Sequence, residues 1–197
     1  MSPGSAGASN GYANGPNGVI TQNPSILPVT VGALGTLSLT VEDQASLICF
    51  LPTNGTAAAL CTGLSGCGGD MTINACTNPP ILDLKSSGSG GQGGGVLTGH
   101  TIVAKLAVSL SNIGATPPGL GSFVLPTTLC TSKGTFTISP AIANGVRTVA
   151  DLIVLADQAL RDPSTFNGPP ITRADINTAL SAINLGFDQC GTFSSCH

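Results

Sequence analysis

Few side chains in this sequence have the types and spacing that catalysis needs, and His100 is the first to consider. It is the only histidine in the interior of the chain, since the other is the terminal His197. A hydrolytic triad would pair His100 with a serine and an acid, but no nucleophile elbow between a strand and a helix is expected to place such a serine. A cysteine partner would have to be reduced. The sequence therefore favours a hydrogen-bonding histidine at a helix start or in a loop, and it predicts no catalytic residue.

A glycine-rich segment, GSGGQG over residues 88–93, has the Gly-x-Gly-x-x-Gly spacing of dinucleotide-binding loops. Such a loop binds phosphate when a helix opens directly after it and an acidic residue follows about 20 positions further on. The residue at that distance is Ile113, which lies between Asn112 and Gly114. The aspartates are also too scattered for a calcium loop. The sequence therefore predicts no cofactor and no metal.

Seven cysteines are spaced irregularly and form no Cys-x-x-Cys pair, which argues against a zinc ribbon or a redox motif. In a chain with so few charges, they are typical of disulfide bonds made in an oxidising compartment. An odd number leaves one thiol free or linked to another chain, and the pairing stays open. The disulfide candidates are Cys49, Cys61, Cys67, Cys76, Cys130, Cys190 and Cys196.

Charged residues make up 8% of the 197 residues, whereas about 25% is usual. The net charge is −3 with six Lys and Arg, so nucleic acid is not an expected partner. No apolar run reaches the roughly 18 residues of a membrane span, and the first residues do not resemble a signal peptide. A surface of Ser, Thr, Asn and Gly loses little hydration when another subunit covers it. Composition therefore predicts assembly with other copies of the chain, and a secreted protein that simply avoids charge is the alternative.

Residues 1–28 are predicted to form an extended arm, because their Asn-Gly, Gly-Pro, Asn-Pro and Leu-Pro steps break regular structure. Residues 29–197 are predicted to form a single disulfide-stabilised α+β domain. Apolar side chains near the end of the arm are expected to anchor it on a neighbouring molecule. These assembly residues are Val19, Ile20, Ile26, Leu27, Val29 and Val31.

Alternation of apolar and polar residues over 29–41 predicts the first strand of this domain. Three Thr-x-x-Asp signatures, which begin at Thr40, Thr148 and Thr172, are typical of helix capping boxes. The last two precede clear amphipathic patterns and are expected to form a helical hairpin. The domain should therefore contain short strands and about four helices. Further short strands are expected at 81–85, 119–125 and 134–138, and residues 96–111 fit either a strand or a helix.

An ordered series of motifs resembles an uncharacterised module of bacterial secreted and cell-surface proteins. The module has no established activity, so the resemblance implies a location and a domain type, and it favours a helix over 96–111. Two departures are Asp157, where the pattern has Asn, and His100, where it often has Gln. The matching segments are FLPTNGT at 50–56 with Leu60, GHTIVAKLAVSLS at 99–111, GLGSFVL at 119–125, TVADLIVLADQAL at 148–160 and RADINTALSAINLGFDQC at 173–190.

These features predict a structural subunit of an extracellular filament or surface assembly. The arm of one copy would dock on the next by adding a strand to its sheet or by lying in a groove. The expected location is outside the cell or on its surface. The alternative is a cell-surface adhesion or ligand-binding module, although the absence of Trp and the single Tyr argue against carbohydrate stacking. An enzyme is the least expected class, because His, Asp, Glu and Lys are scarce.

Overall fold

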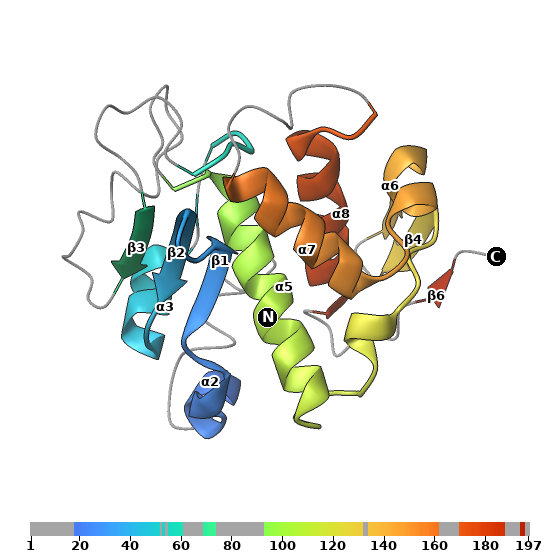
Figure 1. The fold of residues 1–197 in the computed structure, drawn as a ribbon. Coiled ribbons are helices and arrows are strands. Elements are labelled where there is room, and N and C mark those ends of the chain that lie inside the picture. Colours follow the sequence, from blue (N-terminus) through green and yellow to red (C-terminus); the bar gives the residue numbers. More distant parts are fainter. Residues whose placement is uncertain are drawn as a thin grey trace.

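The computed structural model describes residues 18–51, 53, 55–60, 69–73, 93–131, 134–161, 170–187 and 194–195. This part of the chain contains six α-helices and two three-stranded sheets, which confirms the predicted α+β class but exceeds the predicted number of about four helices. Figure 1 shows the first sheet on one side of the molecule, the long helix α5 in the middle, and the second sheet on the other side. None of the described helices is long and apolar enough to cross a membrane.

The first sheet contains β1 (Val29–Ala33), β2 (Leu37–Val41) and β3 (Gly69–Ile73), in that order. β1 and β2 are antiparallel, whereas β2 and β3 are parallel. Val29 and Val31 of β1 are both buried, as expected for alternate positions of a strand with one face in the core. β1 lies at one end of the strand order and is therefore an edge strand of the sheet.

The sequence predicts a single strand over 29–41, and this prediction is wrong because the chain forms a hairpin there. Gly32 and Gly35 adopt φ angles of 82° and 79°, a backbone conformation that is accessible to glycine at little cost. Gly32 lies in β1 and Gly35 lies in the turn at residues 34–36, which reverses the chain into β2. Asp70 of β3 also holds the turn, since its carboxylate accepts hydrogen bonds from the Gly35 N–H and the Ser38 hydroxyl.

The second sheet has the order β5 (Gly134–Thr137), β4 (Thr128–Thr131) and β6 (Ser194–Ser195), and its neighbouring strands are antiparallel. The strand predicted at 134–138 is therefore confirmed. The strand predicted at 81–85 lies outside the described residues. Through the pairing of β6 with β4, the second sheet brings residues 194–195 beside residues 128–131.

The segment 119–125 was also predicted as a strand, and it contains instead the short 3₁₀-helix η2 (Leu120–Ser122). Gly119 begins this turn with a φ of 95°. Ser111 at the end of the preceding helix fixes the loop, because its hydroxyl donates to the Pro117 carbonyl and accepts from the Leu120 N–H. These contacts join residues six and nine positions apart and leave no periodic signal in the sequence.

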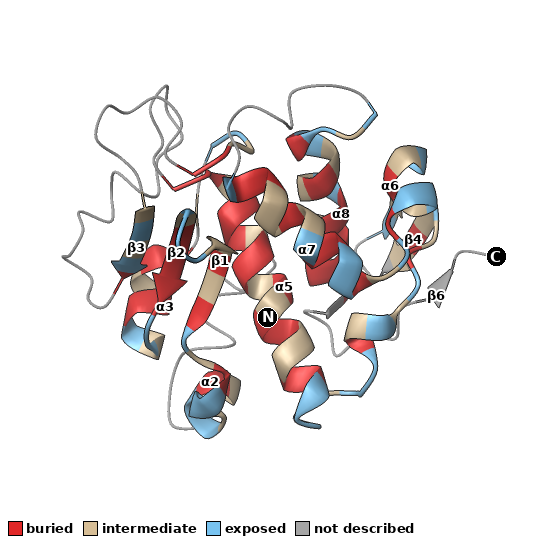
Figure 2. Ribbon diagram, in the orientation of Figure 1, coloured by how far each residue is buried: buried red, intermediate tan, exposed pale blue. Residues whose placement is uncertain are grey.

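Three helices supply most of the core: α5 (Val96–Asn112), α7 (Val149–Arg161) and α8 (Arg173–Phe187). α5 resolves the ambiguity over 96–111 in favour of a helix, as the resemblance implied. α7 and α8 pack against each other, as expected for the predicted hairpin, and both contact α5. Figure 2 shows buried residues concentrated where these three helices meet. Two shorter helices are α3 (Gln44–Phe50) and α6 (Pro140–Gly145).

Capping boxes start α7 and α8, as predicted from the sequence. The Thr148 hydroxyl accepts from the Asp151 N–H, while the Asp151 carboxylate accepts from the Thr148 N–H. Thr172 and Asp175 make the same reciprocal pair. Each box satisfies two N–H groups that the helix backbone leaves unpaired.

We expect Thr148→Ala to lower the free energy of unfolding by about 1 kcal/mol, because the first turn of α7 loses an acceptor. Urea denaturation followed by circular dichroism measures this change. Arg147→Ala is a matched control, since Arg147 is the exposed residue just before the box. Equal losses in the two variants would show that the capping box does not contribute.

The third Thr-x-x-Asp signature acts differently from the prediction. Thr40 is part of β2, where its hydroxyl lies 2.8 Å from the hydroxyl of Thr30 on β1. α3 begins after Asp43, whose carboxylate accepts a 2.7 Å hydrogen bond from the Ser46 N–H. Asp43 is therefore the N-cap itself rather than the fourth residue of a capping box.

The predicted extended arm differs most from the structure. Its described part contains α2 (Val19–Gln22) and the 3₁₀-helix η1 (Pro24–Ile26), and residues 1–17 lie outside the described residues. Ile20 is 1% exposed and Ile26 is 8% exposed, both within this chain's own core. Ile20 and Ile26 bury their apolar side chains in the core of their own molecule, because it is the nearest apolar surface. All six predicted assembly residues belong to that core or pack against it: Val19, Ile20, Ile26, Leu27, Val29 and Val31.

Cys49 of α3 and Cys130 of β4 are both disulfide-bonded. The other five cysteines lie outside the described residues, so the pairing of the seven stays open.

Candidate functional site

His100, the histidine considered first, lies in α5 and faces α8. The Asn184 side-chain amide donates a 3.0 Å hydrogen bond to the His100 carbonyl oxygen and lies 3.2 Å from Nδ1 of the ring. Nδ1 must therefore accept, which leaves the hydrogen on the other ring nitrogen. Burial of the imidazole lowers its pKa from the ordinary value of 6.5. His100 thus makes the hydrogen bonds expected of a structural histidine.

This arrangement predicts a loss of stability at mildly acidic pH. Below pH 6.5 the unfolded chain binds a proton at His100 that the folded chain does not bind, so the free energy of unfolding falls as the pH decreases. The loss levels off below the depressed pKa of the folded state. His100→Gln keeps a polar group beside Asn184 but does not titrate, so its stability should decrease less between pH 7 and 5. Urea denaturation of both proteins across that range measures the difference, and parallel profiles would contradict this account.

No group of three or more His, Cys, Asp or Glu side chains that could hold a metal ion occurs within the described part of the chain. Residues 88–92 of the glycine-rich segment lie outside that part. The described structure therefore offers no geometry from which to build a metal or dinucleotide site.

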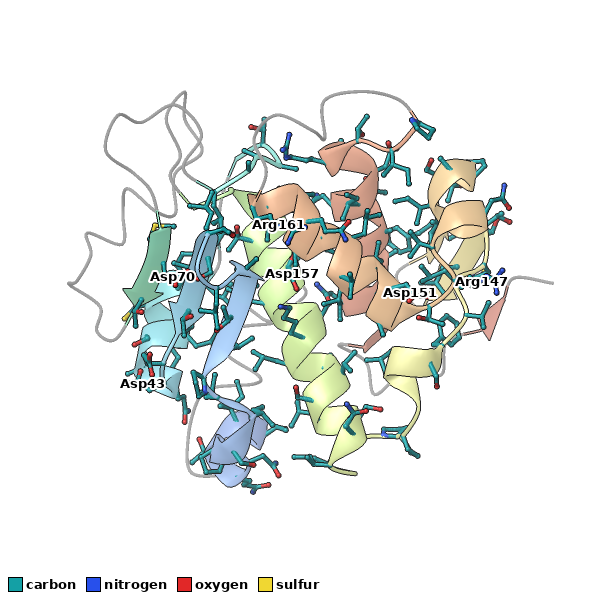
Figure 3. The ribbon with its side chains drawn as sticks, in the orientation of Figure 1. Asp43, Asp70, Arg147, Asp151, Asp157 and Arg161 are labelled. Atoms are coloured by element: carbon teal, nitrogen blue, oxygen red, sulfur yellow. The ribbon has the colours of Figure 1, made fainter. Side chains whose placement is uncertain are left out.

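Most described charged side chains bind the backbone of their own chain. Five aspartates each accept a hydrogen bond from a backbone N–H group, and two cations donate to backbone carbonyl oxygens. Figure 3 shows Asp43 and Asp70 on the side of the first sheet, away from Asp151 and Asp157, which lie at different positions along α7. They therefore do not make the paired carboxylates of general acid–base catalysis. The seven are Asp43, Asp70, Asp151, Asp157, Asp175, Lys105 and Arg173.

Two of these charges meet at the outer edge of β1. Lys105 from α5 and Asp157 from α7 form an ion pair, with 2.6 Å between Nζ and Oδ2. The Lys105 ammonium also donates a 2.5 Å hydrogen bond to the Thr30 carbonyl oxygen. The second carboxylate oxygen, Oδ1, accepts a 3.0 Å hydrogen bond from the Gly32 N–H. The side chains of Lys105 and Asp157 are 22% and 21% exposed. Because both also bond to the backbone of β1, this ion pair ties α5 and α7 to the strand.

The ion pair occupies the place of a neighbouring strand. A residue in a parallel strand would donate to the carbonyl oxygen of one residue and accept from the N–H two positions later. The ammonium and carboxylate make these two bonds to Thr30 and Gly32. Unpaired strand edges otherwise invite another chain to add. We name Lys105, Asp157, Thr30 and Gly32 the edge clamp.

Burial dominates the electrostatics of the edge clamp. Loss of hydration raises the pKa of Asp157, while Lys105, the Gly32 N–H and Arg161 oppose this rise. The carboxylate therefore gains less from its partners than it loses on leaving water. An uncompensated ammonium or carboxylate at this position would be costly, which makes the two side chains mutually dependent.

A mostly apolar groove of about 340 Å³ lies beside the clamp. It is formed by η1, β1, α5 and α7, and Lys105 supplies a charged wall. Ligand pockets commonly have volumes of about 300–1,000 Å³. The apolar lining of the groove includes Ile26, Val29, Val108, Ala150 and Ile153.

The edge clamp is not predicted from the sequence. In the sequence, Asp157 stands out only as a departure from the pattern of the resembling module, and no motif singles out Lys105. Both lie among the apolar residues of amphipathic helices, and a charge in that position is the available signal. The sequence could not pair them, because 52 positions separate them and only the packing of α5 against α7 brings them together.

The fold and the clamp define a small α+β domain with a sheet edge closed by side chains of its own helices. No family model, curated protein or solved structure matches the chain. The resemblance to a module of bacterial surface proteins therefore stays a prediction.

Proposed function

We propose that this chain is a non-catalytic structural subunit of an extracellular or cell-surface assembly, in which it associates with copies of itself. The observation that carries the proposal is the use of charge in the described residues. Charged residues make up only 8% of the sequence, so the surface carries few charges to hydrate. Among the described residues, five aspartates, one lysine and one arginine also bond to the backbone, which leaves few charged groups to act on a substrate. Such a surface can be covered by another subunit at a small desolvation cost.

The disulfide bonds of Cys49 and Cys130 support the proposed location. Secreted domains keep such bonds, and a wider framework that includes the other five cysteines would stabilise each subunit outside the cell. We therefore include a disulfide framework of this kind, together with the lack of a catalytic activity, in the proposed function.

The route of association proposed here differs from the arm predicted from the sequence. The six apolar residues between Val19 and Val31 serve the core, and the edge clamp closes the middle of β1. Among the described residues, large apolar side chains exposed on the surface would make the contacts instead. These are Leu34, Ile113, Val124 and Val154.

Sedimentation velocity and electron microscopy of the oxidised protein over a range of concentrations test the proposal. We expect larger, regular species as the concentration rises. Replacing one or more of these four exposed apolar side chains with Asp should weaken association, because a carboxylate in the interface loses its hydration. The circular dichroism spectrum of the variant should stay unchanged. A monomer at every concentration would refute self-association.

A ligand-binding or adhesion module is the second candidate, and the apolar groove favours it. The fluorescent probe anilinonaphthalene sulfonate should bind the monomer if the groove accepts apolar ligands. Val108→Gln should weaken that binding, because Val108 lines the groove. Val154→Gln is the matched control, since Val154 is exposed on α7 and does not line the groove. Equal binding by both variants would remove the groove as a ligand site.

A further inference from the structure

The edge clamp holds an amine and a carboxyl group in contact in a mostly buried site. Nζ of Lys105 lies 2.6 Å from Oδ2 of Asp157, and both side chains are nearly four-fifths buried. Each group is also fixed by the backbone of β1, through the Thr30 carbonyl oxygen on one side and the Gly32 N–H on the other. Two reactive groups held in contact react as if at very high concentration.

From this geometry we propose that Lys105 and Asp157 are a modification site, at which an amide bond forms between Nζ of the lysine and Cγ of the aspartate. The cross-link would join α5 to α7 covalently. It goes beyond the proposed function, since a binding module could carry it as well as a structural subunit.

The reaction begins with a proton transfer from Nζ to Oδ2, which converts the ion pair into an amine and a carboxylic acid. Burial favours this uncharged pair, because it loses less hydration than two ions do. No outside acid or base is needed for this step, since the proton stays within the pair. The partial exposure of both side chains leaves water a path out of the site.

The Nζ lone pair then attacks Cγ, and negative charge develops on Oδ1. The Gly32 N–H already donates to this oxygen at 3.0 Å, in the manner of an oxyanion-hole donor. The Cγ–Oδ2 bond breaks, and Oδ2 leaves as water with the proton that it received and a second proton from Nζ. The ammonium and carboxylate thus become one amide and one water molecule, with no change of oxidation state.

Mass spectrometry of the intact chain, with its disulfides reduced, tests this inference. We expect the protein to be lighter than its sequence by one water molecule, and a proteolytic peptide pair joined through Lys105 and Asp157. Lys105→Arg keeps a positive charge at the clamp but should restore the full mass. On a denaturing gel, the reduced wild type should migrate ahead of this variant.

The full sequence mass in the wild type would overturn the proposal, whether or not the variant folds. A loss of water that persists in Lys105→Arg, or that maps to another residue such as a cyclised aspartate, would also overturn it. Neither result would affect the proposed self-association, which the sedimentation experiment decides separately.

Discussion

Asp157→Ala should lower the free energy of unfolding by about 3 kcal/mol, because it leaves the Lys105 ammonium partly buried without its counter-charge. The Gly32 N–H loses its acceptor at the same time. For the chain without the amide cross-link, we place the effect at the lower end of the range for broken buried ion pairs, because Lys105 is 22% exposed and can reach water. Urea denaturation at neutral pH measures the loss.

The double variant Lys105→Met with Asp157→Ala tests the cause. It removes the uncompensated charge and puts an apolar side chain of similar length in its place. We expect it to be more stable than Asp157→Ala alone, and this comparison holds with or without an amide cross-link, since neither variant can form one. If the double variant is less stable than the single variant, an uncompensated ammonium is not the source of the loss.

Ile20→Ala should lower the free energy of unfolding by about 2–5 kcal/mol, as is usual when a fully buried isoleucine is truncated. Ile20 is 1% exposed and lies in a core cluster with residues of β1 and the long helices. The effect should not depend on protein concentration, because the contacts are made within one molecule. Thermal and urea denaturation at several concentrations measure both points.

Gln22→Ala on the same short helix is the matched control, since Gln22 is exposed. We expect its effect to stay within about 0.5 kcal/mol. If Ile20→Ala instead leaves the stability of the monomer unchanged but weakens association, the arm predicted from the sequence would be correct and its placement in the core would be wrong.

The sequence predicts those parts of the fold whose signals are local. The two capping boxes start α7 and α8 as expected, since Thr and Asp three residues apart bond each other's backbone N–H groups regardless of the surroundings. The apolar spacing of α7 also matches its buried face. Local chemistry is sufficient for these elements.

The errors occur where tertiary contacts decide. Ile20 and Ile26 are embedded among turn-forming residues, and only the nearby core makes their segment compact. The hairpin between β1 and β2 depends on two glycines with positive φ, within a stretch whose alternation continues through them. The edge clamp requires α5, α7 and β1 to meet, so no single segment contains its signal.

The central claim is that side chains of α5 and α7 close the edge of β1, and hydrogen exchange at one backbone amide tests it most directly. The Gly32 N–H donates to Asp157, whereas the N–H of Val31 points the opposite way, toward β2. We predict that the Gly32 amide is protected in the wild type and loses protection in Asp157→Ala, while Val31 stays protected in both. A Gly32 amide that exchanges as fast as an exposed one in the wild type would contradict the account.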